Sequence, residues 1–203
     1  MEARDFSRVR LHMIITDLVN WHRVLSALQG AGKFNEFVLR LNPFFVNLER
    51  VCWEKQSRKK GQHYRFADLF DRSGKLSSHQ LETLDPDLYR YVTNRIGILK
   101  DGYLSLYVLF YIMEYYHLPE NWKALFQAVF DLNEKRNHVA HRLVSTTDEE
   151  IRQFSGWNAR GIVMKTTEVL GELFAPEYRA ELGGDPRKSY FSLYENCNNL
   201  LRE

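Results

Sequence analysis

Apolar residues recur at three- to five-residue steps through most of this chain, which is the spacing of one face of an α-helix. The first run ends at Gly30 and Gly32 and contains Val9, Met13, Leu18, Trp21, Leu25 and Leu28. The second covers residues 34–54 and contains Phe37, Leu41, Phe44, Leu48 and Val51. Pro43 lies within this second run and is expected to bend it. The pattern predicts two long helices at the start of the chain.

Helical spacing continues in the second half. Asp85 and Pro86 form an N-cap and first helical residue, and the pattern then runs to about residue 116, with a break near Gly97 or Gly102. Residues 119–143 form the next predicted helix. Thr146 with Glu149 resembles a capping box for a helix over about 148–174. We expect breaks before a last helix at 190–201, at Pro176, Gly183, Gly184 and Pro186.

The sequence shows no ladder of alternating strand residues, internal repeat or glycine-rich phosphate loop. The predicted fold class is therefore all-α. We expect one domain over residues 1–203, built as a helical bundle of about five to seven helices.

Residues 55–78 are polar, basic and rich in turn residues, and two interpretations of them remain open. The first is a solvated connection between helices. The second is a surface that grips an RNA backbone, with Tyr64 and Phe66 nearby for base stacking. The candidate RNA-binding residues in this connection are Lys55, Arg58, Lys59, Lys60 and Arg65.

Composition narrows the class of protein. Hydrophobic residues make up 44% and charged residues 27%, which is typical of a folded domain and excludes a disordered tail as the main feature. The net charge of +2 is too small to indicate a nucleic-acid binder by itself. Cys52 and Cys197 form neither a disulfide framework nor a zinc motif, which indicates a reducing compartment.

Targeting and membrane signals are not visible in the sequence. The first ten residues carry charges of both signs, unlike a signal peptide. The most apolar stretch, residues 103–113, is much shorter than the roughly 20 residues that a membrane-spanning helix needs. We therefore expect a cytoplasmic protein without a membrane partner.

The segment that carries chemistry is Arg136-Asn137-His138-Val139-Ala140-His141, late in a predicted helix. It resembles the signature of the HEPN superfamily, in which an arginine is followed five residues later by a histidine, commonly with a polar residue directly after the arginine. Arg136, Asn137 and His141 match this signature position by position, and the resemblance covers residues 85–174. It implies a HEPN-like helical fold.

The resemblance also implies an endoribonuclease that cleaves single-stranded RNA through its own 2′-hydroxyl, without a metal or another cofactor. Histidine titrates near neutral pH, so His141 can serve as general base or general acid. Arg136 can stabilise the charge that builds up on the phosphate, and Asn137 can orient the phosphate or the histidine by hydrogen bonding. His138 is a further candidate RNA contact. Arg58 and His63 have the same spacing, but Gly61 separates them in a predicted loop, so we discount this second match.

Geometry bears on the oligomeric state. Five residues turn a helix by about 500°, so Arg136 and His141 are roughly 140° apart and cannot converge on one face. In the HEPN family two such motifs meet across a twofold axis, so the resemblance implies a homodimer.

The resemblance also suggests two biological settings for the protein. One is a CRISPR-linked ribonuclease in phage defence, with a sensor domain; the other is a toxin held by an antitoxin.

Several alternatives stay open. His141 can be a helix-terminal histidine and Arg136 a surface partner of Glu134 or Asp131, which would leave a non-catalytic helical interaction module. A metal-binding bundle is another alternative, with candidate ligands Glu134, His138, His141, Glu114 and His117. A second Glu-x-x-His pair is missing, so we predict no metal.

Four tyrosines recur at four-residue spacing, and we favour core or dimer packing over base stacking for them. The row consists of Tyr103, Tyr107, Tyr111 and Tyr115.

Overall fold

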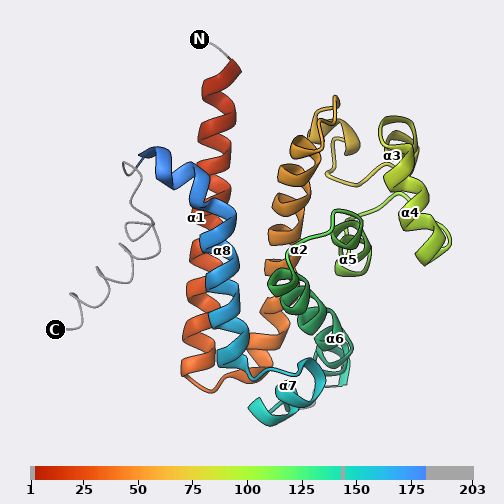
Figure 1. The fold of residues 1–203 in the computed structure, drawn as a ribbon. Coiled ribbons are helices and arrows are strands. Elements are labelled where there is room, and N and C mark those ends of the chain that lie inside the picture. Colours follow the sequence, from red (N-terminus) through yellow and green to blue (C-terminus); the bar gives the residue numbers. More distant parts are fainter. Residues whose placement is uncertain (1–2, 143–144, 182–203) are drawn as a thin grey trace.

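The computed structural model describes residues 3–142 and 145–181 and is almost entirely helical (Figure 1). Its α-helices are α1 Ala3–Gly30, α2 Phe34–Lys59, α3 Ser78–Leu84, α4 Pro86–Ile96, α5 Leu106–Tyr115, α6 Glu120–Arg142, α7 Asp148–Ser155 and α8 Ala159–Glu181. Within the described ranges no strand forms, and two isolated bridges join Leu76 to Phe70 and to Gly102. The predicted all-α bundle is confirmed, with eight α-helices in the described part of the chain in place of five to seven.

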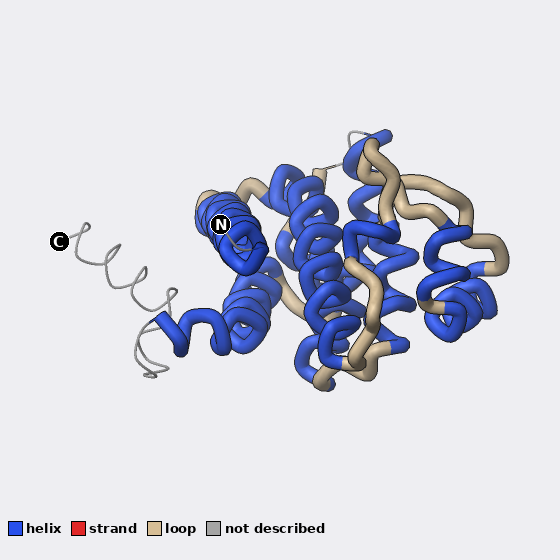
Figure 2. Tube along the Cα trace, turned by 90° about the horizontal axis from the view of Figure 1, so that it is seen from above, coloured by secondary structure: helices blue, strands red, loops and turns tan. Residues whose placement is uncertain are grey.

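Helix α2 is the centre of the bundle and contacts α1, α5, α6 and α8. In two perpendicular views, α1 and α8 lie on one side of it, and α3 and α4 lie on the other (Figures 1 and 2). Large side chains of α2 point into the core on several sides, and each stabilises the fold by about 1.5–3 kcal/mol on burial. The largest that are fully buried are Phe37, Phe44, Phe45, Leu48 and Trp53.

The predicted start of α4 is confirmed, and the break expected near Gly97 or Gly102 falls at Gly97. The Asp85 side chain accepts a hydrogen bond from the Leu88 amide (3.2 Å), and Pro86 is the first helical residue. Gly97 ends the helix with a φ of 82°, which a residue with a Cβ adopts only with strain. Asp85 also accepts hydrogen bonds from the side chains of Gln62 and Tyr64, at 3.0 Å each, and its burial raises its pKa. The buried carboxyl thus ties the connection after α2 to α4.

The single helix predicted over 148–174 is wrong, because the chain forms α7 and α8 there. Gly156 takes a left-handed conformation and ends α7, and the Asn158 side chain then accepts a hydrogen bond from the Gly161 amide (2.8 Å) at the start of α8. The capping box also lies one residue later than predicted, between Thr147 and Glu150. Pro176 does not end a helix, since α8 extends to Glu181. The helix predicted at 190–201 lies outside the described residues.

The basic connection is shorter and better packed than predicted. Helix α2 continues to Lys59, and a 3₁₀ turn occupies Phe66–Leu69. The Phe66 ring lies edge-on to Trp53 at 4.9 Å between centroids, and the Phe70 ring packs beside both. This part of the chain therefore belongs to the hydrophobic core. No helix among the described residues has the length and apolar character needed to cross a membrane.

Candidate active site

The arginine-histidine motif lies in the last turns of α6, which runs without a break from Glu120 to Arg142. Arg136 and His141 therefore share one regular helix, and their positions differ by about 140° around its axis, as predicted. The side chains of His138 and His141 lie outside the described ones. The geometry of the site is consequently built from Arg136, Asn137 and the residues around them.

Arg136 is half-buried and has no carboxylate partner among the described side chains. Its Nη1 donates a hydrogen bond to Oδ1 of Asn137 at 3.0 Å, whereas its Nε is buried without any partner. An unsatisfied buried donor costs about 1–3 kcal/mol. Among the described side chains, Arg136 does not form the ion pair with Asp131 that was one of the predicted alternatives. The Asp131 carboxylate accepts a hydrogen bond from Gln127 Nε2 instead (2.7 Å). The guanidinium is thus held in place by its neighbours and remains able to bind an anion.

Two side chains on α2 hold the end of α6. Asn42 donates from Nδ2 to Oδ1 of Asn133 at 2.9 Å, one helical turn before Arg136. Asn35 accepts from the Thr146 amide at 2.6 Å, just after the helix ends. Sequence reasoning missed both residues. The available signal was their seven-residue spacing, which places both polar side chains on one face of α2.

A third attachment joins α6 to α7. Lys135, which is 5% exposed, donates from Nζ to Oε1 of Glu150 at 2.8 Å. This hydrogen bond lowers the pKa of Glu150, and the same carboxylate accepts the Thr147 amide in the capping box. Lys135 directly precedes Arg136, so the turn that carries the arginine is fixed from two sides.

The RNA-binding residues predicted in the connection lie far from this motif. Asn35 and Asn42 place the first half of α2 beside the motif, whereas Lys59 ends the same helix, roughly 25 Å further along its axis. Arg58 forms an ion pair with Glu54, and Arg65 forms one with Asp68 (2.7 Å). The structure does not bring these side chains to Arg136 within one chain.

Lys60, Tyr64 and Phe66 of the connection contact other parts of the fold. Nζ of Lys60 lies 4.0 Å from the centre of the Tyr115 ring and 4.9 Å from that of Tyr116. Tyr64 donates to Asp85, and Phe66 packs on Trp53. Both rings therefore have partners within the fold, and their use for base stacking stays a prediction.

The described residues contain no group of three or more potential metal ligands. Glu114 forms an ion pair with Arg95 at 3.5 Å, and His117 follows the end of α5 with a φ of 50°. The two residues therefore do not form a Glu-x-x-His pair on one helix, as the metal alternative required. The other three candidate ligands, Glu134, His138 and His141, have side chains outside the described ones.

The first two tyrosines of the row do not pack in the core of the chain, and their packing in a dimer stays a prediction. Tyr103 precedes α5 and is 72% exposed, and Tyr107 is 43% exposed. The Tyr107 ring stacks on Phe130 of α6 at 5.9 Å between centroids, and the Phe110 ring stacks on Phe130 at 4.6 Å. The rings form a surface cluster where α5 meets α6.

Comparison with known proteins agrees with the motif. A family model described as Cas_Csm6 HEPN domain matches residues 15–202. The matched range includes the whole of α2 to α8 and the segment from Arg136 to His141. No curated protein matches the chain significantly.

Proposed function

Because the chain belongs to the Cas_Csm6 HEPN domain family, a CRISPR-associated ribonuclease family, we propose that it is a metal-independent endoribonuclease. Its substrate is single-stranded RNA, and its active-site residues are Arg136, Asn137 and His141. The observation that carries this proposal is the environment of Arg136, which is half-buried, hydrogen-bonded to Asn137 and without a carboxylate partner among the described side chains. A structural arginine of similar burial normally has its charge paired.

The reaction needs few groups, because RNA supplies the nucleophile. The 2′-oxygen loses its proton to a base and forms a bond to the neighbouring phosphorus, while the bond from phosphorus to the 5′-oxygen breaks and that oxygen takes up a proton. His141 serves as the base or the acid in these transfers. The guanidinium of Arg136 binds the phosphoryl oxygens as charge builds up on them. Asn137 fixes the guanidinium through the 3.0 Å hydrogen bond.

A twofold dimer completes the site. One regular helix holds Arg136 and His141 about 140° apart, so a single chain does not direct both at one phosphate. An isologous contact between two copies of α6 brings both arginines and both histidines into one cleft. Two histidines then allow one to accept and one to donate a proton. The family favours a CRISPR-linked role in phage defence over a toxin, with a sensor domain as a further partner.

The test is cleavage of end-labelled single-stranded RNA with and without EDTA, followed by identification of the product ends. We expect cleavage at equal rates in both conditions and products that end in 2′,3′-cyclic phosphates or their hydrolysed forms. An all-2′-deoxy strand of the same sequence is the matched control and stays intact. Activity that EDTA abolishes and manganese or iron restores contradicts the proposal.

A further inference from the structure

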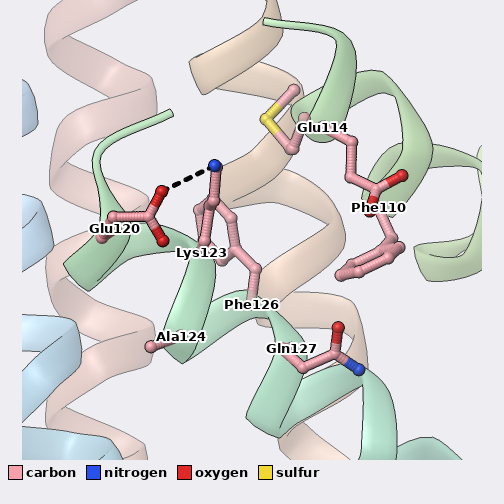
Figure 3. Close-up of a pocket in the computed structure, with 8 residues that line it drawn as sticks. Phe110, Glu114, Glu120, Lys123, Ala124, Phe126 and Gln127 are labelled. Carbon is pink, nitrogen blue, oxygen red and sulfur yellow. Dashed lines mark hydrogen bonds and ion pairs between the residues drawn. The ribbon is translucent and has the colours of Figure 1, made fainter. Parts of the chain in front are cut away.

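A cavity of about 280 Å³ opens between α5 and α6, on the motif helix but away from the motif (Figure 3). We propose that it is a subsite for one nucleobase of the RNA substrate and that it selects bases with an exocyclic amino group. This inference rests on the proposed nuclease function. The cavity is lined by Phe110, Met113 and Glu114 of α5 and by Glu120, Lys123, Ala124, Phe126 and Gln127 of α6.

The floor of the cavity suits a flat aromatic group. Met113 and Phe126 are buried and provide an apolar base, while the half-buried Phe110 offers a ring. Phe110 stacks on Phe130 at 4.6 Å with 25° between the planes, so its orientation is held by a neighbour. The volume lies just below the roughly 300–1,000 Å³ of pockets for drug-sized ligands, which fits one small planar group. Base stacking on an aromatic ring is a common way to bind single strands.

The rim of the cavity is rich in hydrogen-bond acceptors. The Gln127 Nε2 is engaged by Asp131 at 2.7 Å, which leaves its Oε1 to accept, and Figure 3 shows this oxygen on the side where Phe110 lies. The carboxylates of Glu114 and Glu120 are further acceptors. Adenine, cytosine and guanine carry amino N–H donors, whereas uracil has one N–H between two carbonyl oxygens. Acceptors at the rim therefore favour the first three bases.

The carboxylates do not give the rim a strong negative charge. Glu120 is paired with Lys123 at 2.8 Å, as Figure 3 shows, and Glu114 is paired with Arg95 at 3.5 Å. Each rim carboxylate thus has a cation beside it, which reduces repulsion of the RNA backbone while the oxygens remain acceptors. Lys123 also adds one donor for a ring nitrogen or carbonyl oxygen of the base.

The position of the cavity fits a strand that also reaches the motif. Gln127 precedes Asn137 by ten residues of the same straight helix, or roughly 15 Å along its axis. Phe130 lies between them, and its stack with Phe110 and Tyr107 forms a continuous aromatic surface. Around α6, His141 lies fourteen residues after Gln127 and only about 40° from it, whereas Arg136 is about 180° away. A single strand whose scissile phosphate lies between His141 of this chain and Arg136 of the second copy therefore passes the cavity a few nucleotides away.

The experiment measures binding of the full chain to labelled decamers of adenylate, cytidylate and uridylate by fluorescence anisotropy. Every 2′-hydroxyl is methylated, so the strands cannot be cleaved by their own hydroxyls. We expect the adenylate and cytidylate strands to bind about tenfold more tightly than uridylate, a ratio of ordinary size for a few hydrogen bonds at an open site. Phe110→Ala weakens binding of all three strands by roughly tenfold through lost stacking. Gln127→Leu brings the adenylate affinity close to that of uridylate.

The matched control is Tyr103→Ala, because Tyr103 is an exposed aromatic residue that does not line the cavity. It is expected to change each affinity by less than about twofold, within the usual effect of a surface substitution. Equal affinity of the wild-type chain for all three strands overturns the inference. So does a Phe110→Ala effect no larger than that of Tyr103→Ala, or a change of the Phe110→Ala variant from dimer to monomer, which would make this surface an interface between copies.

The outcomes separate this inference from the proposed function. If Phe110→Ala and Gln127→Leu bind RNA as the wild type does while His141→Ala no longer cleaves it, the subsite is wrong and the nuclease stands. If the decamers are discriminated as expected and the wild-type chain cleaves no RNA, the subsite stands and the nuclease is wrong. Circular dichroism of each variant confirms that the fold is retained.

Discussion

Two segments of this chain have the same arginine-histidine spacing, yet the structure gives them opposite surroundings. Arg58 lies exposed at the end of α2 in an ion pair with Glu54, and His63 lies exposed beyond Gly61, after the helix has ended. Arg136 is half-buried within α6, without a carboxylate partner among the described side chains. Spacing alone therefore does not define the site. A rigid helix and an arginine with unused hydrogen-bonding capacity distinguish the second segment.

The largest expected difference between the two segments is in cleavage. Arg136→Ala and His141→Ala should each reduce the cleavage rate by about 10²–10⁴-fold, because each removes a group that acts on the reacting phosphate. Single-turnover cleavage of labelled RNA measures the effect. The double variant Arg58→Ala, His63→Ala is the matched control and should cleave at nearly the wild-type rate. A loss of turnover in the control with full activity in the other two variants would reverse the assignment.

The attachments of α6 should matter more for stability than surface pairs do. Lys135→Met removes the buried partner of Glu150 and is expected to lower Tm by several degrees, since the hydrogen bond between α6 and α7 is lost. Arg152→Met is the matched control, because Arg152 pairs with Glu149 on the exposed side of the same short helix. Its effect on Tm should be small. Equal shifts in thermal unfolding of the two variants would show that the buried pair has no special role.

Helix α2 offers a further contrast between polar positions. Asn35 and Asn42 have partners on or beside α6, whereas Glu49, another seven residues on, is fully buried and neither of its carboxyl oxygens has a partner. Burial raises the pKa of Glu49 well above its usual value. A carboxyl with a raised folded-state pKa favours folding below its unfolded pKa, and this contribution is lost as pH rises toward the folded pKa.

Glu49→Gln should remove this pH dependence. The variant is expected to be more stable than the wild type at pH 8, and the difference should shrink as pH falls and be smallest below about 4, where Glu49 is protonated in both folded and unfolded chains. Chemical denaturation at a series of pH values measures it. Glu36→Gln, at an exposed position of the same helix, is the control and should leave the pH profile nearly unchanged. A constant difference between Glu49→Gln and wild type at every pH would contradict the assignment.

The smallest expected effect is on RNA binding by the basic connection, residues 55–78. Arg58→Ala with Arg65→Ala should weaken RNA binding by no more than about threefold, with the effect greatest at low salt, because both arginines are exposed and paired with acids of their own segment. Anisotropy titrations at two salt concentrations measure this. A loss of tenfold or more would mean that the connection is a principal part of the RNA surface.

Local signals made parts of this structure predictable from sequence. Asp85, Pro86 and Gly97 determine the ends of α4 through their own hydrogen bonds and dihedral angles, so the prediction needed no distant contact. The Arg136-Asn137 contact is equally local, since neighbouring residues supply both partners, although we expected Asn137 to orient the phosphate or the histidine. The family match then supports the HEPN interpretation of the same segment.

Other parts depend on contacts that no local pattern specifies. The hydrogen bond between Asn42 and Asn133 joins residues 91 positions apart, and its existence follows from the packing of α2 on α6. The break at Gly156 was missed because the apolar spacing continues across it at Ile151 and Ile162, on two different helices. Exposure of Tyr103 likewise follows from where α5 begins, which helical spacing alone did not reveal.

The dependence of cleavage on dimerisation tests the central claim most directly. Specific activity toward single-stranded RNA is measured over a dilution series, and the fraction of dimer is measured at the same concentrations by analytical ultracentrifugation. If Arg136 and His141 meet only across a twofold axis, specific activity falls in proportion to the dimer fraction. A monomer that retains full specific activity would contradict the composite site.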